Sequence, residues 1–160
     1  MSKKMSFILN NFEDLVAAAF ICITTVLVVI NIIMRYFLNS GIVWSEEVAT
    51  GCFVWSVFIG AVAVFKHRGH VGVDIIVKRL PQGLQRAVIL ITDIILVALN
   101  GYMSYLSVIY ISKSYTKMTP VLGISSVYIS ASVLIAFIMM TIYSVKFVWQ
   151  DVTGKAKEEN

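Results

Sequence analysis

The sequence predicts an all-α integral membrane protein with four transmembrane helices, and three observations lead to this prediction. Of the 160 residues, 59% are hydrophobic and 14% are charged, whereas soluble domains are about 45–50% apolar and about 25% charged. The mean hydropathy is +0.86. The apolar residues gather in four runs, each near the roughly 20 residues that a membrane-spanning helix needs. We therefore exclude a soluble or disordered chain and expect residues 1–160 to form a single membrane domain.

The first two expected spans are Leu15–Met34 and Val48–Phe65, and charged residues bound both. Glu13 and Asp14 interrupt the N-terminal segment before the first apolar run, so we expect a retained helix and not a cleaved signal peptide. Backbone N–H and C=O groups find no water partners inside a bilayer, so each span must be helical.

The last two expected spans are Ala87–Ile111 and Val127–Val148. The segment that precedes the third span is too short and too charged to cross a membrane. Its apolar residues recur at helical spacing, which predicts a short amphipathic interfacial helix at about residues 71–80. An ordinary connector is the alternative.

Positive charge is distributed unequally between the two sides of a chain with four spans. The two tails and the segment between the second and third spans carry ten of the 13 Lys and Arg residues. The opposite side carries only Arg35, Lys113 and Lys117. Because positively charged loops stay in the cytoplasm, we expect both termini to be cytoplasmic and residues 35–47 and 112–126 to face outward.

A charged cluster is expected at the outer end of the first helix pair. Arg35 ends the first span, while Glu46 and Glu47 open the second, and only about ten residues separate them. We favour an interfacial ion pair that fixes the hairpin, and substrate binding by Arg35 is the alternative. Glutamates suit a helix N-terminus, and Ser45 is the expected N-cap.

One face of the second span carries Glu47, Gly51 and Trp55, which follow one another at intervals of four residues. Gly51 would permit close approach of another helix. Trp55 would lie near the middle of the membrane and pack on a neighbouring helix.

Asp93 is the one acidic residue well inside a span, about 10 Å deep at 1.5 Å per residue. A carboxylate at this depth must be protonated, paired or close to water. Asn100, Ser104 and Ser107 continue the same helical face. We favour a polar seam packed against another helix, and a proton or ion site is the alternative.

The remaining candidates for chemistry predict neither an enzyme nor a bound cofactor or metal. His70 and Asp74 are four residues apart and would form a local hydrogen bond, because a metal site needs further ligands. Motifs for nucleotide binding or hydrolysis are absent from the sequence, and nothing indicates a nucleic-acid partner. Cys22 and Cys52 lie at different depths of their spans, so we expect two free, buried thiols.

Six short motifs follow one another along most of the chain. They are Arg35, W-S-E-E at Trp44–Glu47, F-V-W-S-V-F-I-G at Phe53–Gly60, R-G-H-V-G-V-D at Arg68–Asp74, L-P at Leu80–Pro81 and T-P-V-L-G-I at Thr119–Ile124. In their order and spacing, these motifs resemble the small membrane subunit of TRAP (tripartite ATP-independent periplasmic) transporters, the DctQ-type family.

The resemblance implies a role in secondary transport across the bacterial inner membrane. Such systems combine a periplasmic solute-binding protein, a large multi-helix carrier subunit and a small subunit. They couple uptake of a carboxylate-bearing solute to a sodium gradient. The substrate and sodium sites belong to the large subunit, and the small one would brace its stationary scaffold among the membrane lipids.

The residues of this chain that would serve such a role form two groups. Structural or interface candidates are Arg35, Trp44, Glu46, Glu47, Gly51, Trp55, His70, Asp74, Asp93 and Asn100. Lys113 and Lys117 are candidates for docking the periplasmic binding protein.

Two other functions fit a small four-helix membrane chain. A self-sufficient exporter would need an essential acid in the first span, and Leu15–Met34 has none. A membrane anchor subunit of a redox complex would need histidines within the spans, and both histidines lie outside them.

Overall fold

Four long α-helices form the structure, a computed structural model that describes residues 11–67 and 81–153. The helices are α2 (Phe12–Phe37), α3 (Val43–Lys66), α5 (Gln82–Ser114) and α6 (Val127–Thr153). Each is long and apolar enough to cross a membrane, which confirms the expected all-α class with four spans. The expected interfacial helix at about residues 71–80 lies outside the described residues.

Each helix extends beyond the apolar run that predicted it, and charged residues occupy the ends. Glu13 lies in the first turn of α2 and Arg35 in the last turn, while Lys66 ends α3. Carboxylates near a helix N-terminus and cations near a C-terminus both interact favourably with the helix dipole. Pro81 precedes α5, and its carbonyl accepts hydrogen bonds from the N–H groups of Leu84 (2.9 Å) and Gln85 (3.0 Å).

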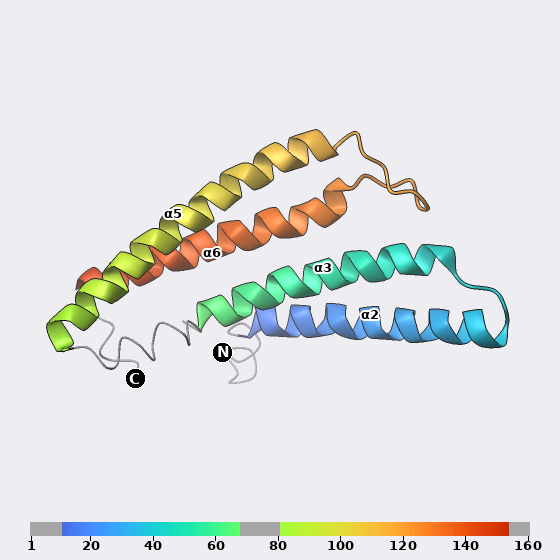
Figure 1. Cartoon of the computed structure of the whole chain (residues 1–160), viewed down its shortest axis with the longest axis horizontal. Coiled ribbons are helices and arrows are strands. Elements are labelled where there is room, and N and C mark those ends of the chain that lie inside the picture. Colours follow the sequence, from blue (N-terminus) through green and yellow to red (C-terminus); the bar gives the residue numbers. More distant parts are fainter. Residues whose placement is uncertain (1–10, 68–80, 154–160) are drawn as a thin grey trace, which may run out of the picture.

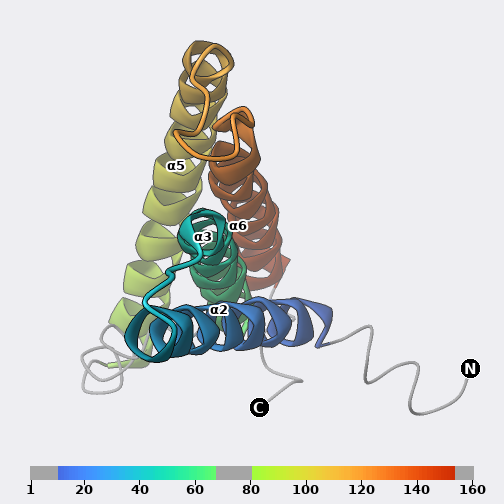
Figure 2. The same cartoon turned by 90° about the vertical axis from the view of Figure 1, so that its right-hand side faces the viewer.

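The helices are arranged as two antiparallel hairpins, α2 with α3 and α5 with α6 (Figure 1). The hairpins meet along α3 and α6, which lie side by side in Figure 2. Backbone packing among the described helices joins α2 to α3, α3 to α6 and α6 to α5. The order of neighbours is therefore an open row, and α2 and α5 lie at its two ends.

The apolar core is small and lies between α3 and α6. Val62, Ala136 and Met140 are buried, and aromatic side chains surround them. Phe58 contacts Phe137 edge to face, with ring centroids 6.3 Å apart. This core and the rings around it hold the two hairpins together.

Among the described helices, α2 and α5 each pack against one neighbour, and their outer faces are left uncovered. In the most apolar stretch of each of these helices, 11% of the residues are buried, against 28% in α6. Contiguous apolar surface of this extent needs lipid or another protein to cover it.

Candidate functional site

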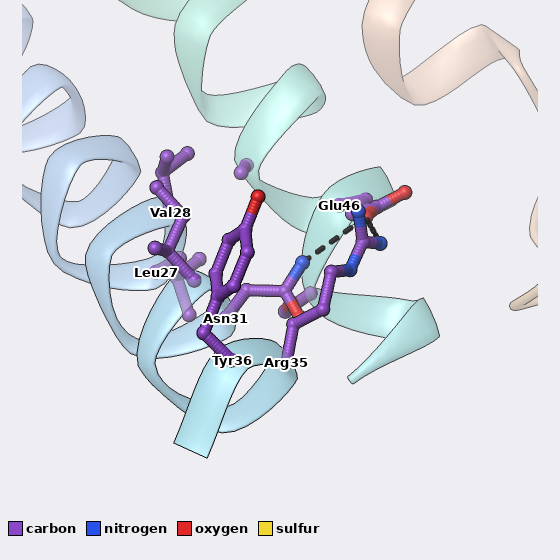
Figure 3. A pocket seen from close by; sticks show the side chains of 9 residues that line it. Leu27, Val28, Asn31, Arg35, Tyr36 and Glu46 are labelled. Atoms are coloured by element: carbon purple, nitrogen blue, oxygen red, sulfur yellow. Dashed lines mark hydrogen bonds and ion pairs between the residues drawn. The ribbon is translucent and has the colours of Figure 1, made fainter. Parts of the chain in front are cut away.

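A pocket of about 320 Å³ lies between α2 and α3, near the connector that joins the two helices (Figure 3). Apolar side chains line one part of it, and polar side chains line the part nearer the connector. The lining residues are Leu27, Val28, Asn31, Ile32, Arg35, Tyr36, Ser45, Glu46 and Ala49.

An ion pair and an amide side chain organise the polar end of this pocket. The Arg35 Nη2 atom lies 2.5 Å from Glu46 Oε1, so these expected partners do meet. Asn31 Nδ2 donates to the same oxygen at 3.1 Å, and Asn31 Oδ1 accepts from the Ile42 N–H at 2.8 Å. Asn31 is only 8% exposed, so it links both helices and the connector from a buried position.

Asn31 was not among the residues expected at this site, although the sequence contains a feature that points to it. It is an amide within an otherwise aliphatic run and precedes Arg35 by four residues, which places both on one helical face. The Arg35 and Glu46 side chains are 61% and 54% exposed, and an ion pair so exposed contributes only about 0–1 kcal/mol to stability. The buried amide is therefore the stronger link in the hairpin.

Two expectations about the start of α3 are wrong. Glu47 does not join Arg35, because its Oε2 accepts a hydrogen bond of 2.8 Å from the N–H of Leu122 in the other hairpin. Ser45 is not the N-cap, because α3 already begins at Val43 and the Ser45 hydroxyl donates to the Ile42 carbonyl at 2.7 Å. Trp44, in the first turn, is half exposed.

The face of α3 that carries Trp55 does contact neighbouring helices. The Trp55 indole N–H donates to the Tyr128 carbonyl of α6 at 3.1 Å, and the ring stacks on Phe20 of α2 at 5.7 Å. Gly51 faces Ile129 of α6, and a Cβ at this glycine would lie 4.0 Å from that side chain. Because 4.0 Å is an ordinary packing distance, the approach of α6 does not require glycine at this position.

Polar side chains connect α5 and α6 along the expected seam. Asn100 Nδ2 donates to Ser144 Oγ at 3.3 Å, and Ser104 Oγ lies 3.3 Å from Thr141 Oγ1. Ser107 instead donates to a carbonyl of its own helix. Asp93 is also buried, with 6% of its surface exposed.

A second charged cluster, at the opposite end of the molecule from the pocket, was not foreseen. Glu13 Oε2 of α2 lies 2.9 Å from Lys66 Nζ of α3. The Tyr143 hydroxyl of α6 donates to Glu13 Oε1 at 2.7 Å. Glu13 was expected only to bound the first span, yet its carboxylate joins three helices. Glu13 begins the first span and Lys66 ends the second, so their position at the same end of the helix pair could have predicted this ion pair.

The loop between α5 and α6 is held in a compact form by its own hydrogen bonds. Thr119 N–H donates to the Ile124 carbonyl at 2.8 Å, and Gly123 supplies the positive φ of 64° that the turn requires. Lys113, in the last turn of α5, and Lys117, in the loop, are both exposed. They therefore lie at the same end of the molecule as Leu122 and Glu47.

The remaining candidates from the sequence are a histidine–aspartate pair and two cysteines. His70 and Asp74 lie outside the part of the chain that the structure describes. Within residues 11–67 and 81–153, groups of three or more His, Cys, Asp and Glu that could hold a metal ion are absent. Both cysteines are free as expected, but Cys22 is exposed on α2 and Cys52 is partly buried, so the expectation of buried thiols is wrong.

Known proteins similar to this chain are small subunits of one class of transporter. A TRAP transporter small permease protein from Haemophilus influenzae is 34% identical over 110 residues, which are 69% of this chain and 67% of the relative. The C4-dicarboxylate TRAP transporter small permease protein DctQ from Vibrio cholerae is 34% identical over 77 residues, 48% of this chain and 33% of the relative.

A longer relative carries a similar segment. The isethionate TRAP transporter permease protein DctMQ from Oleidesulfovibrio alaskensis is 28% identical over 120 residues, which are 70% of this chain but 19% of the relative. The similarity therefore covers about two thirds of the first relative and much smaller parts of the other two.

The family assignment follows from a match across most of the chain. The family model for tripartite ATP-independent periplasmic transporters, DctQ component, matches residues 24–154. Those residues include all of α3, α5 and α6, as well as the pocket at the end of α2. The chain belongs to the DctQ family, the small, multi-pass inner-membrane subunit of TRAP transporters, which is not an enzyme.

Proposed function

We propose that this chain braces the stationary scaffold of a large carrier subunit during sodium-coupled uptake of an organic anion. The open row of helices carries the proposal, because within residues 11–67 and 81–153 it leaves much of the apolar surface of α2 and α5 uncovered. The DctMQ relative supports a large partner, since a segment like this chain makes up only 19% of it.

The exposed face of α5 has the chemistry of a protein contact. Tyr102 and Tyr105 are 60% and 63% exposed, and their hydroxyls form no hydrogen bonds within the described residues. Both lie near the middle of the Ala87–Ser114 span, whereas membrane tyrosines favour the interfaces. A phenol hydroxyl in hydrocarbon is costly without a partner. We therefore infer that this face of α5 contacts the carrier.

The exposed face of α2 differs in that it is aliphatic. Val29 and Ile33 are about half exposed there, and the Thr25 hydroxyl is satisfied by the Ile21 carbonyl at 2.8 Å. Because the Thr25 hydroxyl is already hydrogen-bonded within α2, this face needs no partner with polar groups. We therefore infer that lipid covers it.

Photo-crosslinking tests this assignment of faces. p-Benzoylphenylalanine would replace Tyr102 or Tyr105, and as controls Val29 or Ile33, in the full chain co-expressed with the carrier. We expect crosslinks to the carrier from the two α5 positions and not from the two α2 positions. Crosslinks from α2 alone would refute the assignment, and their absence from all four positions would refute the bracing role.

The transported solute and the energy source are part of the same proposal. The name of the Vibrio cholerae relative specifies a C4-dicarboxylate, which supports a carboxylate-bearing solute. The name of the DctMQ relative specifies isethionate, a sulfonate, so the common chemistry is an organic anion. We expect a sodium gradient, without ATP, to drive uptake into vesicles that contain both subunits and a periplasmic solute-binding protein.

The proposed orientation places both termini in the cytoplasm, because ten of the 13 basic residues then lie on that side. The pocket and the loop that carries Lys117 would then face the periplasm, where the binding protein delivers its solute. A cysteine at position 117, in a variant without Cys22 and Cys52, should react with an impermeant thiol reagent added to intact spheroplasts. Reaction only after lysis would reverse the orientation.

A further inference from the structure

We propose that the pocket between α2 and α3 binds one phosphatidylethanolamine molecule, with its phosphate at Arg35, its ammonium at Glu46 and an acyl chain along α2. The inference does not depend on the proposed function, because it rests only on the chemistry of this pocket. Nothing in the family assignment specifies a ligand for it.

The pocket has the polarity gradient that a membrane lipid has. Arg35 and Glu46 lie at one end, and Val28 and Leu27 lie away from them (Figure 3). Ile32 also lines the pocket. Val28 and Arg35 are seven residues apart, about 10 Å along a helix. A headgroup at the charged end would therefore leave an acyl chain beside the apolar side chains, several of which are exposed on the flank of α2.

The charged end retains unused hydrogen-bonding capacity. Within the described residues, Arg35 donates only through Nη2, to Glu46 Oε1. Glu46 Oε1 also accepts from Asn31, and Glu46 Oε2 forms no hydrogen bond with the described residues. The guanidinium can therefore donate to a phosphate while the second carboxylate oxygen accepts from an ammonium group.

The charge balance favours a zwitterionic headgroup over an anionic one. Arg35 and Glu46 contribute one positive and one negative charge, so an anionic headgroup attracted by Arg35 would also meet the carboxylate. A phosphate joined to a primary ammonium complements both charges. A choline headgroup carries the same charges but has no N–H to donate to Glu46.

Native mass spectrometry of the full-length chain, delipidated in detergent, tests the proposal. The probes are phosphatidylethanolamine, phosphatidylglycerol and phosphatidylcholine with identical acyl chains. We expect the ethanolamine lipid to bind at least about fivefold more tightly than either of the others, which corresponds to about 1 kcal/mol, the net contribution of one ordinary hydrogen bond. Equal binding of the ethanolamine and glycerol lipids would overturn the proposal.

Two neighbouring substitutions locate the acyl chain. Val28→Trp would fill the pocket and should weaken ethanolamine-lipid binding about tenfold or more, a difference that corresponds to about 1.4 kcal/mol. Val29→Trp adds the same ring to an exposed residue that does not line the pocket, so binding should stay within about twofold. Unchanged binding by Val28→Trp would place the lipid elsewhere.

A second variant covers the case in which Val28→Trp does not fold, which circular dichroism would reveal. The nearly isosteric double change Arg35→Gln and Glu46→Gln should abolish the preference for the ethanolamine lipid, whereas Lys113→Gln should preserve it. Retained preference in the double variant would overturn the proposal. Glycerophosphoethanolamine and inorganic phosphate serve as competitors, and equal competition by either one would show a site for a soluble ligand instead of a lipid.

Discussion

Glu47 at the start of α3 accepts a 2.8 Å hydrogen bond from the backbone N–H of Leu122, at the tip of the loop between α5 and α6. The two residues belong to different hairpins, so this bond closes the α3–α6 contact at the end that carries the α5–α6 loop. Glu13 makes the corresponding link at the other end, through Lys66 and Tyr143. Polar contacts therefore stabilise the packing of α3 against α6 at both ends.

Replacement of Glu47 should weaken the contact between the two hairpins at the end that carries the α5–α6 loop. Glu47→Ala removes the acceptor for Leu122 and should lower the free energy of unfolding by about 1–2 kcal/mol, because the bond is charge-assisted but near solvent. Glu47→Gln keeps an acceptor oxygen and should retain most of the stability. Thermal unfolding of the full chain in detergent measures both, and equal losses would contradict the role of this bond.

Replacement of Glu13 should have a larger effect, because the ion pair is buried. The Lys66 and Glu13 side chains are 17% and 8% exposed. Glu13→Gln would remove the negative charge that the Lys66 ammonium contacts at 2.9 Å and should lower the free energy of unfolding by about 1.5–3 kcal/mol, the range for a hydrogen bond to a charged group. Tyr143→Phe removes only one hydrogen bond and should cost about 1–2 kcal/mol.

A double-mutant cycle checks that the Glu13 effect belongs to the pair. The variant with both Glu13→Gln and Lys66→Met should unfold at a higher temperature than the sum of the single effects predicts. Simple additivity of the two single changes would show that the pair contributes no coupling.

Asp93 is predicted to be structural and not a sodium or proton site. It is buried on the face of α5 that continues to Asn100, where the seam with Ser144 begins. Asp93→Asn preserves volume and hydrogen bonding while it removes the charge. Sodium-driven uptake by the assembled complex should persist, and loss of sodium coupling in a correctly assembled complex would reject the structural role.

Two exposed lysines, Lys113 at the end of α5 and Lys117 in the α5–α6 loop, are predicted to guide the periplasmic binding protein. The double reversal Lys113→Glu and Lys117→Glu should slow uptake when the binding protein is limiting and leave assembly intact, because rim charges mainly change the rate of encounter. The measurement is uptake by reconstituted vesicles across a titration of binding protein at low and high salt. Identical titration curves for the variant and the wild type at low salt would exclude a docking role.

The sequence by itself determined the four helices and the meeting of Arg35 with Glu46. Apolar runs long enough to cross a bilayer leave the backbone no alternative to helix, so composition and run length suffice for this level of structure. The connector between Phe37 and Val43 is short, so charges at the two helix ends must lie close together. These inferences depend on the local chain alone.

The partner of Glu47 was decided only by the tertiary structure. Adjacent residues of a helix point about 100° apart, so Glu46 and Glu47 cannot both face α2 once the helix extends back to Val43. Glu46 meets Arg35 and Asn31, while Glu47 reaches the loop of the other hairpin. The packing order α2, α3, α6, α5 could not be predicted from the sequence either. The spans are apolar on almost every side, so their patterns do not specify which faces pack together.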